Sequence, residues 1–212
     1  MSKFCDFLKT DYPIHFGITW NDTTMQIRKE LPNGVVFEIR DQQPTIEQVK
    51  GEGVSVIRRK EELAEVVDFE AYSKTIHGTD NTPSCCDFVI SPYASNEYII
   101  FNELTFSASN YILPFTQKTT GSEQKGKLAY AREQLITTIE RIYEVNNILD
   151  NYSQKIALFS CRLSDKKGNN PMTRSAKHFN APIMKFERMV FHEELPHGFK
   201  FAMRVYNKAY NL

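Results

Sequence analysis

Hydrophobic residues recur along the chain with two different periods, and each period predicts a different kind of element. Between Lys127 and Asp150 they return every three or four residues, which is typical of one face of a helix of about six turns. This predicted stripe consists of Leu128, Ala131, Leu135, Thr138, Ile142, Val145 and Leu149. Near the C-terminus, apolar and polar residues alternate from Phe199 to Val205, which predicts a half-buried strand.

The first third of the chain contains shorter patterns. Aromatic and β-branched runs predict strands over Ile14–Trp20, Val35–Arg40 and Val54–Arg58. A possible cap at Asn21 or Asp22 favours a short helix over Asn21–Leu31. The spacing of apolar residues in Lys60–Tyr72 predicts an amphipathic helix.

Three apolar segments surround the long helix. Cys86–Ser91 and Tyr98–Phe106 predict two strands, and the short connection Pro92–Glu97 between them suits a hairpin. Lys155–Arg162 predicts a buried strand after the helix. The order strand, strand, long helix, strand favours an α/β core in which the helix crosses from one strand to the next.

The composition is that of an ordinary globular protein. The chain has 212 residues, 41% hydrophobic and 25% charged, and its loop-like stretches Ser107–Gly126 and Ser164–Thr173 do not mark a domain boundary. We therefore expect one α/β domain over residues 1–212. Lysine plus arginine equals aspartate plus glutamate, at 26 each, which argues against non-specific coating of nucleic acid but not against a local basic groove.

The cysteines and the N-terminal segment bear on location. The four cysteines form no C-x-x-C pair, so neither a zinc site nor a disulfide framework is indicated, and a reducing compartment is favoured. The N-terminal segment lacks the apolar core of a signal peptide, and no apolar run approaches the roughly 18 residues that span a bilayer. We expect a cytoplasmic protein with no membrane association.

Two acidic residues stand inside apolar strands, Asp87 in CDFVIS and Glu103 in YIIFNELTF. A buried carboxylate is costly unless it is paired, hydrogen-bonded or bound to a cation. In a hairpin the two acids approach each other, and their repulsion raises a pKa unless a cation neutralises them. Hard oxygen ligands suit Mg²⁺ or Mn²⁺, and such an ion activates water and stabilises a phosphodiester in the transition state.

The two acids belong to a longer series of motifs. Asp87 on one strand and Glu103 on the next are followed by A-Y-A-R-E-Q-L on the long helix and by S-C-R at the end of the next strand. This series resembles the PD-(D/E)XK superfamily of restriction-endonuclease-like nucleases, over about residues 60–162. The resemblance implies a mixed central sheet flanked by helices, metal binding by Asp87 and Glu103, and contact of Gln134 or Arg132 with the scissile region.

The chain departs from this family at one important position. The family's E-x-K motif has a lysine where Glu103-Leu104-Thr105 has threonine, which supplies no positive charge. Lys127 is the candidate replacement, because it lies two helical turns before Gln134 on the same helix face. In some relatives an early helix adds an acid, which here would be Glu62, Glu65 or Glu70.

Three hypotheses follow. In the first, the chain is a nuclease with catalytic residues Asp87, Glu103, Lys127 and Gln134, with Mg²⁺ or Mn²⁺ as cofactor and nucleic acid as partner. In the second, motivated by Thr105 and the neutral net charge, it is a catalytically inactive nuclease fold that binds a partner, such as a protein. In the third it is an unrelated α/β protein, in which Asp87 is a structural acid and Glu103 faces solvent.

Overall fold

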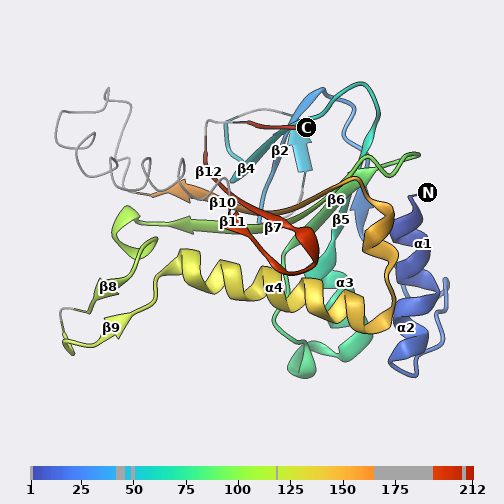
Figure 1. The fold of residues 1–212 in the computed structure, drawn as a ribbon, viewed down its shortest axis with the longest axis horizontal. Coiled ribbons are helices and arrows are strands. Elements are labelled where there is room, and N and C mark those ends of the chain that lie inside the picture. The colour runs from blue at the N-terminus through green and yellow to red at the C-terminus, as the bar shows by residue number, and fades with distance from the viewer. Residues whose placement is uncertain (1, 42–45, 49–50, 118, 165–192, 207–208) are drawn as a thin grey trace.

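A computed structural model describes residues 2–41, 46–48, 51–117, 119–164, 193–206 and 209–212 (Figure 1). Helices and strands alternate along this part of the chain, so the protein is of the mixed α/β class. The α-helices are α1 (Lys3–Lys9), α2 (Asp11–His15), α3 (Phe69–His77) and α4 (Lys127–Val145). Short 3-10 helices cover Thr79–Asn81, Ser109–Tyr111, Ile148–Asn151 and Pro196–Gly198.

The larger sheet has seven strands among the described residues, in the order β1-β5-β6-β7-β10-β12-β11. Its strands are β1 (Lys29–Glu30), β5 (Ala64–Asp68), β6 (Phe88–Pro92), β7 (Tyr98–Ser107), β10 (Gln154–Leu163), β11 (Glu193–Glu194) and β12 (Lys200–Val205). β5, β6 and β7 form an antiparallel meander, whereas β7, β10 and β12 run parallel. Helix α4 provides the crossover from β7 to the parallel strand β10 (Figure 1).

A second sheet covers one face of the first. Its strand order is β13-β4-β2-β3, and the small hairpin β8-β9 lies apart from both sheets (Figure 1). These strands are β2 (Val36–Ile39), β3 (Ile46–Gln48), β4 (Ser55–Arg58), β13 (Tyr210–Asn211), β8 (Phe115–Thr116) and β9 (Glu123–Gln124).

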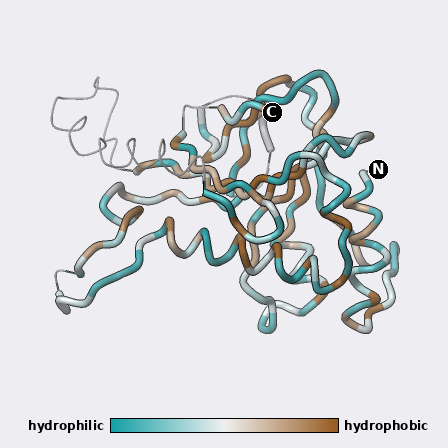
Figure 2. Tube along the Cα trace, in the orientation of Figure 1, coloured by the Kyte–Doolittle hydropathy of each residue, from teal (hydrophilic) through white to brown (hydrophobic). Residues whose placement is uncertain are grey.

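Two hydrophobic clusters lie on opposite faces of the larger sheet. One packs the sheet against α1, α3 and α4, and the other packs it against β2 and β4. The central strands are therefore buried on both faces, and Figure 2 shows hydrophobic residues concentrated along them. This burial modifies one prediction: the strand expected from Phe199 to Val205 is present as β12, but Ala202 is buried together with Phe201 and Met203.

Several predicted elements are confirmed. Strands expected over Val35–Arg40, Val54–Arg58 and Lys155–Arg162 correspond to β2, β4 and β10. The long helix begins at Lys127 as expected but ends at Val145, and Leu149 is buried from the following 3-10 helix. The stretch expected to be a loop before it contains β8 and β9. The predicted loop Ser164–Thr173 lies outside the described residues after Ser164.

The prediction of a helix over Lys60–Tyr72 is wrong. Ala64–Asp68 forms strand β5 between β1 and β6, and helix α3 begins only at Phe69. The Asp68 side chain accepts a hydrogen bond from the backbone N–H of Ala71 at 2.9 Å, which caps the helix at that point. Local spacing suggested a helix because strand β5 is buried on both faces and so lacks a clear alternation.

Two earlier predictions are also wrong. The strand expected over Ile14–Trp20 is absent, because α2 continues to His15 and Gly17 then adopts φ 73°. The helix expected over Asn21–Leu31 is absent too. There, the Asn21 side chain accepts a hydrogen bond from the backbone N–H of Thr23, which favours a turn, and Lys29–Glu30 pairs with β5. None of the helices in the described ranges is long and apolar enough to span a membrane.

Candidate functional site

The predicted hairpin between the two acidic strands is confirmed. β6 pairs antiparallel with β7, and Phe88 lies opposite Asn102. Asp87 directly precedes Phe88, and Glu103 directly follows Asn102, so the two acids lie next to each other at one end of the hairpin. The backbone N–H of Leu104 donates a hydrogen bond to Asp87 Oδ2 at 2.6 Å, which fixes this carboxylate against β7.

The position of Glu103 follows from the alternation along β7. Ile99 and Phe101 belong to the hydrophobic cluster that contains α4, whereas Ile100 and Leu104 belong to the cluster on the other face. Glu103 shares its face with Ile99 and Phe101, so its carboxyl group enters the layer between the sheet and α4. Only 6% of Glu103 is exposed, and within the described part of the chain its Oε2 has no hydrogen-bond partner.

Both acids are shifted toward their protonated forms. Burial raises the pKa of Glu103 to about 9, and the negative charges of Asp87 and Glu70 add to the effect. Burial likewise raises the pKa of Asp87 to about 7; the hydrogen bond from Leu104 opposes this rise, and the charges of Asp41 and Glu70 add to it. The pair therefore carries less negative charge at neutral pH than two free carboxylates, and a bound cation would stabilise its ionised form.

A cavity of about 280 Å³ opens beside Glu103, between the end of β7 and the first turns of α4. It brings together three of the four residues predicted from the sequence, namely Glu103, Lys127 and Gln134. Its other lining residues are Asp41, Leu104, Thr105, Phe106, Tyr130 and Ala131. The fourth predicted residue, Asp87, does not line the cavity but lies beside Glu103 through the Leu104 contact.

The two predicted helix residues differ in their surroundings. Lys127 is exposed at the start of α4, in the cavity wall that also contains Thr105. Gln134 is half-buried, and its Nε2 donates to the backbone carbonyl of Cys85 at 3.3 Å, which ties α4 to the segment before Asp87. Arg132, the alternative to Gln134, instead pairs with Glu193 on β11 at 2.6 Å.

The three candidate early acids have separate roles. Glu70, on α3, adds its charge to both members of the pair. Glu65 is fully buried in β5 and binds Ser2 and Lys29, so it fixes the N-terminal segment to the sheet. Glu62 accepts hydrogen bonds from the backbone N–H groups of Ala94 and Ser95 and from the Ser95 hydroxyl.

Sequence reasoning missed Asp41. This residue follows β2, lines the cavity and raises the pKa of both Asp87 and Glu103. Its own pKa is raised by burial and by the charges of Glu70 and Asp68. A pattern search could not select it, because an acid after a short strand is common and its closeness to Glu103 depends on how the second sheet packs against the first.

The donor chemistry of the pair fits a hard cation. No group of three or more histidine, cysteine, aspartate or glutamate side chains in the described ranges is arranged to hold a metal ion. Asp87 and Glu103 would supply only part of a coordination shell. Mg²⁺ is commonly held by one or two carboxylates together with water and substrate phosphate, so Glu103 in the cavity wall, with Asp87 beside it, matches that class of site.

Comparisons with protein-family models, with curated proteins and with solved structures found no match.

Proposed function

We propose that the Asp87–Glu103 pair binds Mg²⁺ or Mn²⁺ and that the adjoining cavity cleaves a phosphodiester bond of nucleic acid, as in PD-(D/E)XK-like nucleases. One observation supports this above all: a buried Glu103 carboxyl oxygen, which has no hydrogen-bond partner in the described part of the chain, lies beside a second acid at a cavity also lined by Lys127 and Gln134. A buried carboxyl group in this situation is unfavourable for stability unless a ligand compensates for it.

The residues of the site take distinct roles in this proposal. Asp87 and Glu103 hold the ion, which when bound supplies a water of lowered pKa and positive charge near the phosphate. Lys127 provides the ammonium group that Thr105 cannot provide, because both line the same cavity. Gln134 keeps the α4 side of the cavity in place through its contact with the Cys85 carbonyl.

The direct test is thermal unfolding with and without millimolar Mg²⁺ or Mn²⁺. An ion that binds only the folded state raises its stability by RT ln(1 + [L]/Kd). We expect a rise in melting temperature for the wild-type protein and no rise for the double variant Asp87→Asn, Glu103→Gln. Glu97→Gln is the matched control, because Glu97 lies at the opposite end of the same hairpin and pairs with Lys60.

The same proteins are then assayed for metal-dependent cleavage of labelled single-stranded and duplex DNA and RNA. Loss of cleavage in the Asp87→Asn and Glu103→Gln single variants, with folding retained, is the expected result. Cleavage that survives in both variants would refute the assignment of the acids. Lys127→Ala is expected to lower the rate, and Lys127→Arg, which keeps the charge, is expected to retain more of it.

Thr105 favours a second candidate function, a nuclease-like fold that binds a partner without cleaving it. A threonine lines the cavity where the family pattern has its lysine. No metal-dependent rise in melting temperature, combined with no cleavage in any metal, would favour this alternative over the nuclease.

A further inference from the structure

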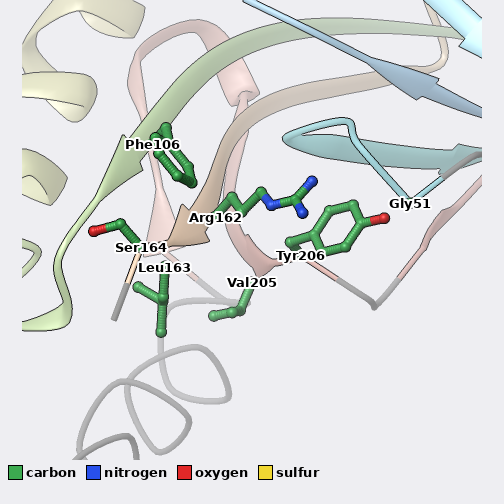
Figure 3. Close-up of a pocket in the computed structure, with 7 residues that line it drawn as sticks. All are labelled: Gly51, Phe106, Arg162, Leu163, Ser164, Val205 and Tyr206. Carbon is green, nitrogen blue, oxygen red and sulfur yellow. The ribbon is translucent and has the colours of Figure 1, made fainter. Parts of the chain in front are cut away.

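A second cavity, of about 380 Å³, lies near the first at the ends of β7, β10 and β12 (Figure 3). Figure 3 shows the Arg162 side chain between the rings of Phe106 and Tyr206. The remaining lining residues are Gly51, Leu163, Ser164 and Val205. The nuclease proposal assigns no role to this cavity.

Arg162 and Tyr206 form a platform that is fixed before any ligand arrives. The guanidinium carbon of Arg162 lies 4.4 Å from the centre of the Tyr206 ring, and Arg162 Nη1 donates to the Gly53 carbonyl at 2.8 Å. The Tyr206 hydroxyl donates to Glu38 Oε1 at 2.8 Å. Arg162 is thus held by a neutral carbonyl oxygen and by the face of the Tyr206 ring.

Glu38 links the two parts of the platform, because it binds the Tyr206 hydroxyl and the turn that contains Gly53. It is 1% exposed, and its carboxylate accepts hydrogen bonds from three successive backbone N–H groups, those of Gly51, Glu52 and Gly53. The same turn supplies the Gly53 carbonyl that holds Arg162. A platform whose two planar groups are both held by a buried, satisfied network is typical of a pre-organised binding site.

Phe106 joins the two cavities. It lines both of them and is 62% exposed. Glu103 faces α4, whereas Arg162 lies on the face of β10 that also includes Leu158 and Ser160, toward β4. The two cavities therefore lie on opposite faces of the sheet and meet at the end of β7.

We propose that this second cavity binds an unpaired base of a single-stranded nucleic acid, which stacks on Phe106, Arg162 and Tyr206 while a neighbouring phosphate lies in the Glu103 cavity. The inference rests on the proposed nuclease function. Aromatic and guanidinium faces bind bases of any sequence by stacking. A strand that passes from one face of the sheet to the other must bend sharply at Phe106, which a single strand does readily and a stiff duplex does not.

The test is fluorescence anisotropy of a labelled oligothymidine in buffer with EDTA, so that neither metal binding nor cleavage contributes. We expect the wild-type protein to bind the single strand more tightly than a duplex of equal length. Phe106→Ala is expected to weaken binding about five-fold or more, because it removes a stacking surface. Phe106→Trp should retain binding, and Phe106→Leu, which keeps apolar volume but not the ring, should not.

Controls separate stacking from loss of folding or of general charge. Tyr93→Ala removes an exposed aromatic residue just beyond β6, at the other end of the β6–β7 hairpin, and should bind as the wild type does. Arg162→Ala should weaken binding, whereas Lys60→Ala, which removes one exposed positive charge at that other end, should change it little. A thermal melt of each variant establishes that it is folded.

The outcomes separate this inference from the nuclease proposal. Absence of oligonucleotide binding, equal binding of the duplex, or wild-type affinity in folded Phe106→Ala and Arg162→Ala would each overturn the base-stacking site. Selective single-strand binding that depends on Phe106 and persists in Glu103→Gln supports it. If such binding occurs without any metal-dependent rise in melting temperature, the nuclease proposal fails while the binding site stands.

Discussion

Among the residues selected from the sequence, Glu103 has the most unusual surroundings for its chemical type. An acid in the middle of an apolar strand is rare enough to be selected from the sequence, and the structure places it in the layer under α4, next to Asp87. Within the described residues its Oε2 has no hydrogen-bond partner, and burial together with the charges of Asp87 and Glu70 raises its pKa.

This environment predicts a pH-dependent stability. The pKa of an unfolded glutamate is about 4.3, whereas the pKa of folded Glu103 is raised to about 9. Between these values the unfolded state binds fewer protons than the folded state, so without metal the free energy of unfolding should fall as pH rises. We expect urea denaturation in EDTA to show this fall for wild type and a smaller fall for Glu103→Gln. Identical slopes in both proteins would contradict the buried acid.

At the residue scale, the sequence selected residues that the structure places close together, and their roles remain a prediction. Asp87 and Glu103 were predicted because charges interrupt apolar runs, Gln134 because of the family resemblance, and Lys127 because it shares a helix face with Gln134. Asp41 and the cavity lined by Phe106, Arg162 and Tyr206 could not be predicted in this way. Their roles depend on contacts between segments far apart in the chain, which no local period encodes.

At the scale of elements, periodicity predicted helix α4 and long apolar runs predicted strands β7 and β10, whereas the short strand β5 was mistaken for a helix. Helix α4 shows a clear stripe because its outer face meets solvent. Strand β5 is covered on both faces and includes the buried Glu65, so its sequence does not alternate and its pattern of apolar residues is also compatible with a helix. Long-range pairing with β1 and β6 determines its conformation instead.

The start of α4 depends on Gly126. This residue adopts φ 81° and ψ 159°, and a Cβ there would lie 2.5 Å from the backbone of Leu113. Gly126→Ala should therefore destabilise the protein by about 2 kcal/mol or more in urea denaturation, from backbone strain plus the clash. Gly121→Ala is the control, because Gly121 also has positive φ but a Cβ there meets no described atom within 4 Å. Equal losses in the two variants would exclude a role for the clash.

At the scale of the whole molecule, the two hydrophobic clusters share the central strands. Ile99 and Phe101 of β7 belong to one cluster, and Ile100 and Leu104 to the other. A hydrogen-bonded group of Ser55, Asn102 and Ser160 also connects β4 to β7 and β10. Loss of packing on one face should therefore weaken the other.

Ile57→Ala tests this coupling, because Ile57 is fully buried in the cluster on the β4 side. We expect a loss of about 2–5 kcal/mol. The single tryptophan, Trp20, packs against the opposite cluster, so its fluorescence should report the same shifted transition as far-ultraviolet circular dichroism. Ile14→Ala, at a residue 68% exposed, should change stability little. A Trp20 transition that stays at the wild-type position would indicate two independently unfolding parts.

Among the described residues, the larger sheet ends on both sides in very short strands, since β1 and β11 have two residues each. A sheet edge offers its free N–H and C=O groups to any extended peptide that lies along it, and the length of the edge limits how many bonds such a peptide can form. β1 and β11 each pair with only two residues of their neighbours, β5 and β12. Edge strands this short form few backbone bonds with an added peptide, whereas the longest strands, β7 and β10, present side chains at the ends where the two cavities open.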